Sequence, residues 1–102
     1  MSIWQGSDLK FLVEITAEGF DIDNDNYTIV LKRGAKEVTV NKSDIIVDDD
    51  EHFLCVTKEQ LAELGTGDIY IVTYAEVPDP DFVETNIRRE VDKQLLCTIN
   101  RV

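Results

Sequence analysis

Hydrophobic and polar residues alternate along most of the chain, and this period of two is typical of β-strands with one buried face. The alternation predicts strands at residues 9–15, 27–32, 36–40, 44–47, 52–56 and 68–77. Clusters of Asp, Asn, Gly and Pro separate these segments and favour turns. Gly34-Ala35 predicts a hairpin. Two apolar faces predict that 68–77 is a central strand.

One segment predicts a helix. Thr57 as N-cap and Gln60 three residues later form a capping box, and Gly65 supplies a left-handed stop. A helix this short serves as a connector between strands. Residues 87–100 fit both a helical stripe and strand alternation. We favour a strand there, because Leu95–Ile99 is a compact apolar run that can close a sheet.

The spacing of these elements indicates the fold class. About seven strands separated by turn residues indicate an all-β sandwich of two antiparallel sheets with one short helical connector. The 102 residues fit a single domain, 1-102. A composition of 43% hydrophobic and 30% charged residues argues against disorder.

The chain is strongly acidic. It carries 10 Lys and Arg against 21 Asp and Glu, a net charge of -11. The only basic pairs, Lys32-Arg33 and Arg88-Arg89, stand among acids, so we expect neither a nucleic-acid partner nor an anionic membrane surface. The acidity favours solubility. The alternatives are cation binding, a basic partner protein, or imitation of the charge of DNA.

The first residues of the chain contain no basic stretch followed by an apolar run. No apolar stretch reaches the roughly 18 residues that span a bilayer. We therefore expect a chain that is not secreted by a signal peptide and not inserted in a membrane.

Asp21, Asp23 and Asp25 have the alternate spacing of the first ligands in a calcium loop. The rest of that pattern is missing, because Asn26 stands at the glycine position and Lys32 at the position of the bidentate glutamate. The flanking segments also read as strands instead of helices. We expect a solvated turn, with calcium binding as the alternative.

Other candidates for chemistry are incomplete. His52 and Cys55 resemble half of a zinc site, but a spacing of three on a strand points them to opposite faces, and no second pair exists. Asp48–Glu51 predicts an acidic turn. No serine elbow or glycine-rich phosphate loop is present. We therefore expect that the chain is not an enzyme and has no cofactor.

Cys55 and Cys97 each lie in an apolar run. This environment predicts buried free thiols, and a disulfide between two strands is the alternative. Trp4 and Phe82 flank predicted strands, where an aromatic side chain either caps the core or anchors a partner subunit.

Three segments resemble a known family. They are Gln5–Phe11, then Phe53–Tyr70 with its strand, Thr57-led helical turn and second strand, and Pro80–Glu90. The first two are similar to the immunoglobulin-like N-terminal domain of phage baseplate upper proteins. The third is similar to small phage tail-associated proteins.

The resemblance implies an immunoglobulin-like antiparallel β-sandwich of about seven strands. It implies a non-enzymatic structural or adaptor module that assembles with other virion or tail proteins, or with itself as a homo-oligomer. The implied location is the virion or the bacterial cytoplasm. The resemblance transfers no catalytic or ligand residues. The other functions that we expect to test are a calcium-binding β module and an acidic DNA mimic that inhibits a host protein.

Overall fold

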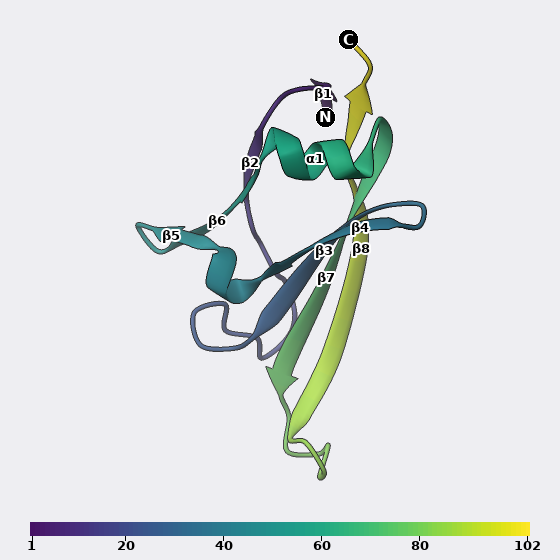
Figure 1. Cartoon of the computed structure of the whole chain (residues 1–102). Helices are drawn as coiled ribbons and strands as arrows, with labels where there is room; N and C mark the ends of the chain where they lie inside the picture. The colour runs from purple at the N-terminus through teal and green to yellow at the C-terminus, as the bar shows by residue number, and fades with distance from the viewer.

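The computed structural model describes all 102 residues and shows two β-sheets and one α-helix (Figure 1). The elements in chain order are β1 (Ser2–Trp4), β2 (Leu9–Leu12), β3 (Tyr27–Arg33), β4 (Lys36–Asn41), a 3-10 turn (Lys42–Asp44), β5 (Ile46–Asp48), β6 (Glu51–Val56), α1 (Lys58–Leu64), β7 (Gly67–Pro78) and β8 (Ile87–Asn100). The strand order is β1-β8-β7-β3-β4 in the larger sheet and β2-β6-β5 in the smaller one. The predicted mainly β architecture with one short helix is confirmed.

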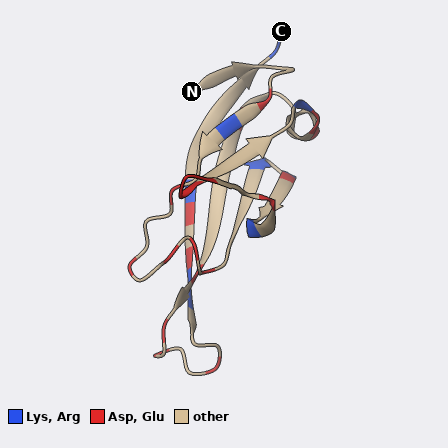
Figure 2. Ribbon diagram, turned by 90° about the vertical axis from the view of Figure 1, so that its left-hand side faces the viewer, with Lys and Arg blue, Asp and Glu red and all other residues tan.

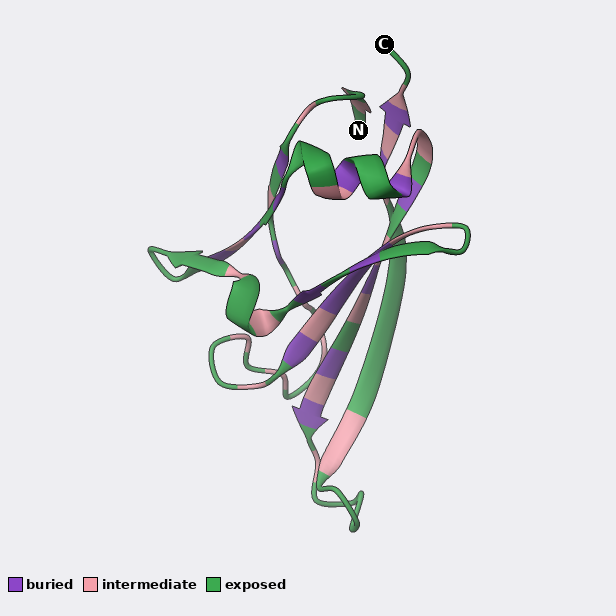
Figure 3. Cartoon of the chain, in the orientation of Figure 1, coloured by how far each residue is buried: buried purple, intermediate pink, exposed green.

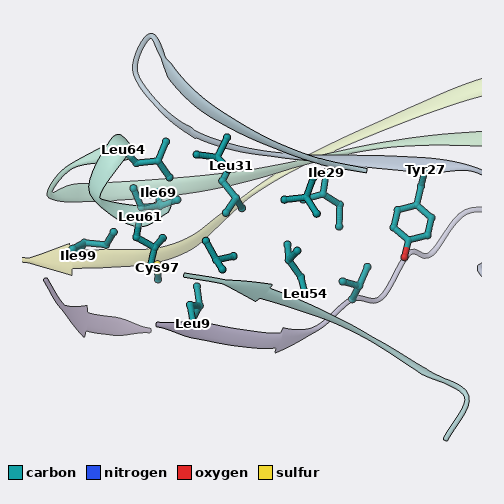
Figure 4. Close-up of a cluster of buried hydrophobic side chains, with 14 residues drawn as sticks. Leu9, Tyr27, Ile29, Leu31, Leu54, Leu61, Leu64, Ile69, Cys97 and Ile99 are labelled. Atoms are coloured by element: carbon teal, nitrogen blue, oxygen red, sulfur yellow. The ribbon is translucent and has the colours of Figure 1, made fainter. Parts of the chain in front are cut away.

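The hydrophobic core lies between the two sheets, and α1 closes one end of it (Figure 4). β3 contributes Tyr27, Ile29 and Leu31, which are all buried. β6 contributes Leu54 and Val56 from the opposite sheet. The alternation in β3 therefore gives the larger sheet one apolar face that the smaller sheet covers.

β7 is the central strand of the molecule, as its two apolar faces predicted. It pairs with β3 on one side and with β8 on the other. A register shift at Ile69/Tyr70 leaves Leu96 of β8 without a direct partner. β7 and β8 extend beyond the smaller sheet, so the molecule measures 50 × 32 × 19 Å, with the 79–86 loop at one tip (Figure 1).

The predicted turns and the N-terminal cap of the helix are confirmed, whereas Gly65 ends the helix with φ 84° and ψ -165°, which is not the left-handed helical conformation that was predicted. Gly34-Ala35 joins β3 to β4, and Arg33 pairs with Lys36 across the turn. Thr57 and Gln60 form the capping box of α1. The acidic turn is a two-residue hairpin in which Asp49 and Asp50 have φ values of 54° and 66°. Positive φ at both central residues is the geometry of a type I′ turn, which Asp tolerates.

Three strand predictions need correction. β2 ends at Leu12 instead of residue 15, and the segment predicted as a strand over 44–47 begins as a 3-10 turn and becomes β5 only at Ile46. β1 was not predicted, since a strand of three residues is too short to show alternation. β1 pairs with the end of β8 in parallel, so the sandwich is not antiparallel throughout. Residues 87–100 form a single strand, as favoured.

The two cysteines are free. Cys97 is buried as predicted, but the prediction for Cys55 was wrong, because this residue is exposed. Leu54 and Val56 on either side of it point into the core, and the alternation of the strand turns Cys55 outward. No helix in the structure has the length and apolar character needed to cross a membrane.

Candidate functional site

The three aspartates of the calcium-like loop do not converge on one point. The Asp21 carboxylate accepts hydrogen bonds from the Asp23 backbone N–H (3.0 Å) and from the Asn24 side chain (2.6 Å). The Asp25 carboxylate accepts one from the Asp21 backbone N–H at 2.8 Å. The Asn24 bond, followed by the Asp23 bond, lowers the pKa of Asp21. No group of three metal-ligating side chains forms here or elsewhere in the chain.

A lysine occupies the oxygen-rich centre of this loop. The Lys42 ammonium donates to the backbone carbonyls of Asp23 at 3.0 Å and of Asp25 at 2.7 Å. Carbonyl oxygens of this kind are ligands for calcium. These two carbonyls thus accept hydrogen bonds from the ammonium of Lys42, a cationic side chain of the same chain.

His52 fixes the same loop to the core. It is the one buried polar or charged residue, and its Nε2 lies 2.9 Å from Oδ1 of Asp23 while its Nδ1 lies 3.3 Å from the hydroxyl of Tyr27. A neutral imidazole protonated on Nε2 satisfies both contacts, because it donates to Asp23 and accepts from Tyr27. Burial raises the pKa of Tyr27 and keeps its hydroxyl from solvent. The arrangement therefore holds the loop in place and offers no exposed nucleophile.

Trp4 lies at one end of the molecule, on β1. It is 62% exposed and forms one wall of an apolar groove of about 300 Å³ between β1 and α1. Ile3, Leu61 and Ile99 also line this groove.

Phe82 lies at the opposite end, in the loop between β7 and β8 (Figure 1). It is 49% exposed, and the Asp79 carboxylate beside it accepts hydrogen bonds from the Asp81 N–H and from Arg88. Neither Trp4 nor Phe82 belongs to the core, and the structure does not bring the two together.

The most extensive exposed apolar surface lies instead on the outer face of the larger sheet. Its members come from β3, β7 and β8 and are here called the outer patch: Val30, Tyr70, Val72, Tyr74, Val91 and Leu95. The two tyrosines, Val91 and Leu95 are exposed, whereas Val30 and Val72 are buried at its centre. Val91 is 61% and Leu95 is 55% exposed, and the middle part of β8 is exposed from residue 89 to 95 (Figure 3). Sequence analysis identified apolar residues on both faces of β7 and predicted a central strand, without identifying an exposed apolar face.

The strand registers make the outer patch continuous. Tyr70 pairs with Leu95, and Tyr74 pairs with Val91. Val72 pairs with Val30 between them. Residues directly opposite each other on neighbouring strands share a face of the sheet, so these side chains form one surface. Lys93 lies on this surface with its ammonium 5.0 Å from the centre of the Tyr70 ring.

The outer face is charge-balanced, unlike the rest of the molecule. Strand alternation places Lys32, Arg89 and Lys93 on it, together with Glu37, Asp68 and Glu76. The remaining seven basic and eighteen acidic residues carry the whole net charge of -11. Acidic residues gather in loops, whereas basic residues lie mostly on strands (Figure 2). The outer face therefore lacks the strong electrostatic repulsion that a highly acidic surface exerts on another acidic protein.

The free edge of β8 is protected against strand pairing. Only Thr98–Asn100 pair with β1, so the rest of the strand has an open edge. Five of the residues from Ile87 to Leu95 are charged. Charged side chains along an edge strand disfavour the addition of another strand. The larger sheet thus has an edge that disfavours the addition of a strand, and next to it an apolar face that is open to solvent.

The smaller sheet carries a narrower apolar strip. Leu12, Phe53 and Ile46 lie side by side across its three strands. The Lys10 ammonium lies 4.8 Å from the centre of the Phe53 ring and covers part of the strip. The outer patch is therefore the stronger candidate for contact with a protein partner.

The chain matches no family model, and comparison with curated proteins and with solved structures finds no match.

Proposed function

We propose that this protein is a non-enzymatic assembly module, a structural or adaptor component of a phage or prophage tail or baseplate. It docks on neighbouring proteins through the outer patch, in the virion or during assembly in the bacterial cytoplasm. The observation that carries the proposal is a continuous, charge-balanced apolar surface on a sheet whose other face is already covered. Contiguous exposed apolar surfaces mark interaction sites on soluble domains.

The composition of the outer patch supports a protein partner. Tyr70 and Tyr74 present rings together with hydroxyl groups, and tyrosine is enriched at the centre of protein interfaces. Val91 and Leu95 add aliphatic area beside the two rings. Lys93 and the Lys32–Glu37 ion pair, whose atoms lie 3.1 Å apart, supply a polar rim. A buried apolar centre with a polar rim is the usual anatomy of an interface.

We further propose that the two sheets form an immunoglobulin-like sandwich. β8, β7 and β3 correspond to strands G, F and C of that fold, and β4 corresponds to C′. β2, β6 and β5 correspond to B, E and D in the second sheet. The chain departs from antibody domains, because both cysteines are free and no tryptophan lies on β3. The strand order supports the resemblance to phage immunoglobulin-like domains.

Site-specific photo-crosslinking tests this function. A benzoylphenylalanine residue replaces Tyr74 in the outer patch, and a matched protein carries the same residue at Val47, which is 57% exposed on β5 of the other sheet. Both proteins are irradiated in the cells that assemble the particle, and the adducts are identified by mass spectrometry. We expect adducts at position 74 with a structural protein of the particle or with a second copy of the chain.

Two results contradict the proposal. One is an equal yield of adducts at positions 74 and 47, which means that the outer patch is not a preferred contact. The other is an adduct at position 74 with an enzyme that has no place in a particle. That result favours an inhibitor over an assembly module.

A further inference from the structure

We infer that the outer patch binds the outer patch of a second copy of this chain. A two-fold axis relates the two copies. It lies between the larger sheet of one copy and the larger sheet of the other, and it runs across the strands. This inference rests on the function proposed above and names the partner of that site. It follows from the arrangement of the side chains on the outer face and from the distribution of charge.

The outer patch consists of three parallel rows of side chains that run across the sheet. The pairing of β8 with β7 and of β7 with β3 sets these rows. In order along β7, they are Leu95 with Tyr70, then Lys93 with Val72 and Val30, then Val91 with Tyr74. The first and third rows both have an aliphatic residue on β8 beside a tyrosine on β7, and they differ on β3, where Lys32 pairs with Tyr70 and Thr28 pairs with Tyr74. The middle row contributes two valines.

This repetition makes the surface complementary to itself. A two-fold axis through the middle row exchanges the first and third rows of the two copies. Tyr70 then faces Tyr74 of the second copy, and Leu95 faces Val91 of the second copy. The middle row lies near the axis, where Lys93 is exposed and Val72 and Val30 are already buried in each copy. Each copy presents the same surface, as an isologous contact requires, and the sheets stack about 10 Å apart as in other sandwiches.

The charge distribution favours a second copy over a basic partner. A basic protein is attracted to the acidic residues, which gather in loops (Figure 2). Two copies that meet through their outer faces hold their acidic loops apart and bring together surfaces without net charge. Lys93 faces its own equivalent, and its ammonium already lies over Tyr70. Its long side chain can keep the charge in solvent at the rim. Asp68 and Glu76, at the two ends of the outer face of β7, face each other across the contact.

The size of the outer patch predicts a reversible dimer. Three strands about 4.8 Å apart, over five residues with a rise of about 3.3 Å each, give a footprint of roughly 240 Å². A standard interface buries about 800 Å² of accessible surface on each partner. We therefore expect a population of dimers that grows with protein concentration in place of a permanent dimer.

Light scattering after size exclusion tests the inference on the full chain. We expect the average mass to rise from 11.6 kDa toward twice that value as the protein is concentrated to the millimolar range. Val91→Arg places a charge in the outer patch and is expected to hold the mass at 11.6 kDa throughout. Val47→Arg is the matched control, an equally exposed valine on the other sheet, and is expected to dimerise like the wild type. Circular dichroism establishes that both variants are folded.

Three outcomes overturn the inference. A wild-type protein that stays monomeric at all concentrations has no second-copy contact. Dimerisation that survives Val91→Arg uses another surface. Dimerisation lost equally in both variants reflects added charge alone. If the protein is monomeric while the photo-crosslinker at position 74 captures another particle protein, the second-copy inference fails and the proposed function stands. If no such adduct forms either, both fail.

Discussion

The two faces of the larger sheet have similar apolar sequences and different surroundings. On the inner face, Ile29 and Leu31 of β3 and Ile69 of β7 have no exposed surface. On the outer face of the same strands, Tyr70 and Tyr74 remain in contact with solvent. The smaller sheet and α1 cover the inner face, and no element of the chain covers the outer patch.

This difference shows what an apolar strand pattern does and does not determine. Apolar residues on both faces of a strand indicate that both faces are to be covered. They do not say whether the cover comes from the same chain or from another molecule. Replacements on the inner face therefore change the stability of the fold. Replacements of the exposed residues of the outer patch are expected to change association with the proposed partner.

The largest effect is expected from Leu31→Ala on the inner face. Leu31 is fully buried, so the replacement loses its transfer free energy and leaves a cavity. We expect the free energy of unfolding to fall by about 2–5 kcal/mol. Urea denaturation followed by circular dichroism measures this loss. A decrease below about 1 kcal/mol would mean that the inner face is not the packed core described here.

A smaller effect is expected from His52→Ala at the margin of the inner face. The replacement leaves the buried Tyr27 hydroxyl without its partner and frees Asp23. We expect a loss of about 1–3 kcal/mol in urea denaturation, the usual cost of an unsatisfied buried polar group. Asp23→Asn keeps an oxygen acceptor for Nε2 and serves as the milder control. Equal losses in the two variants would contradict the role assigned to the imidazole.

The pH dependence of stability distinguishes the buried tyrosine from the two exposed ones. Burial raises the pKa of Tyr27 above its ordinary value of 10.0, so the folded state keeps the proton that the unfolded state releases. Its contribution to stability is complete below pH 10 and is lost as the pH rises further. We expect a decline in the unfolding free energy above pH 10 that is weaker in Tyr27→Phe. Unchanged slopes in that variant would assign the decline to other groups.

The smallest effect is expected from Val91→Ala on the outer patch. Val91 is more than half exposed, so its truncation removes little buried area from a single copy. We expect the unfolding free energy of the dilute protein to change by no more than about 0.5 kcal/mol. Urea denaturation at low micromolar concentration measures it. A loss as large as that of Leu31→Ala would mean that this face is covered within the chain.

The sequence predicted best where local chemistry decides the structure. Three features depend on only a few neighbouring residues each. They are the capping box of Thr57 and Gln60, the turn at Gly34 and the acidic turn that ends at Glu51. The alternation in β3 likewise identified its buried face. The choice of a strand for 87–100 followed from one apolar run.

The sequence predicted less well where distant segments decide. Cys55 lies in an apolar run, but the pairing of β6 with β2 turns it outward. Lys42 reaches the 21–25 loop only after the chain has folded, and no spacing in the sequence links them. The outer patch combines residues from three strands, so it emerges only when their registers are known. The apolar residues on both faces of β7 indicated such a surface, but the sequence does not tell which face stays exposed to solvent.

The most direct test of the account maps the contact surface by nuclear magnetic resonance. Backbone amide spectra of the labelled protein are recorded from low micromolar to millimolar concentration. We predict chemical-shift changes that cluster at Tyr70–Tyr74 and Val91–Leu95 and that are absent in Val91→Arg. Changes confined to the Trp4 groove, the Phe82 loop or the strip around Phe53, or spectra that do not change with concentration, would contradict it.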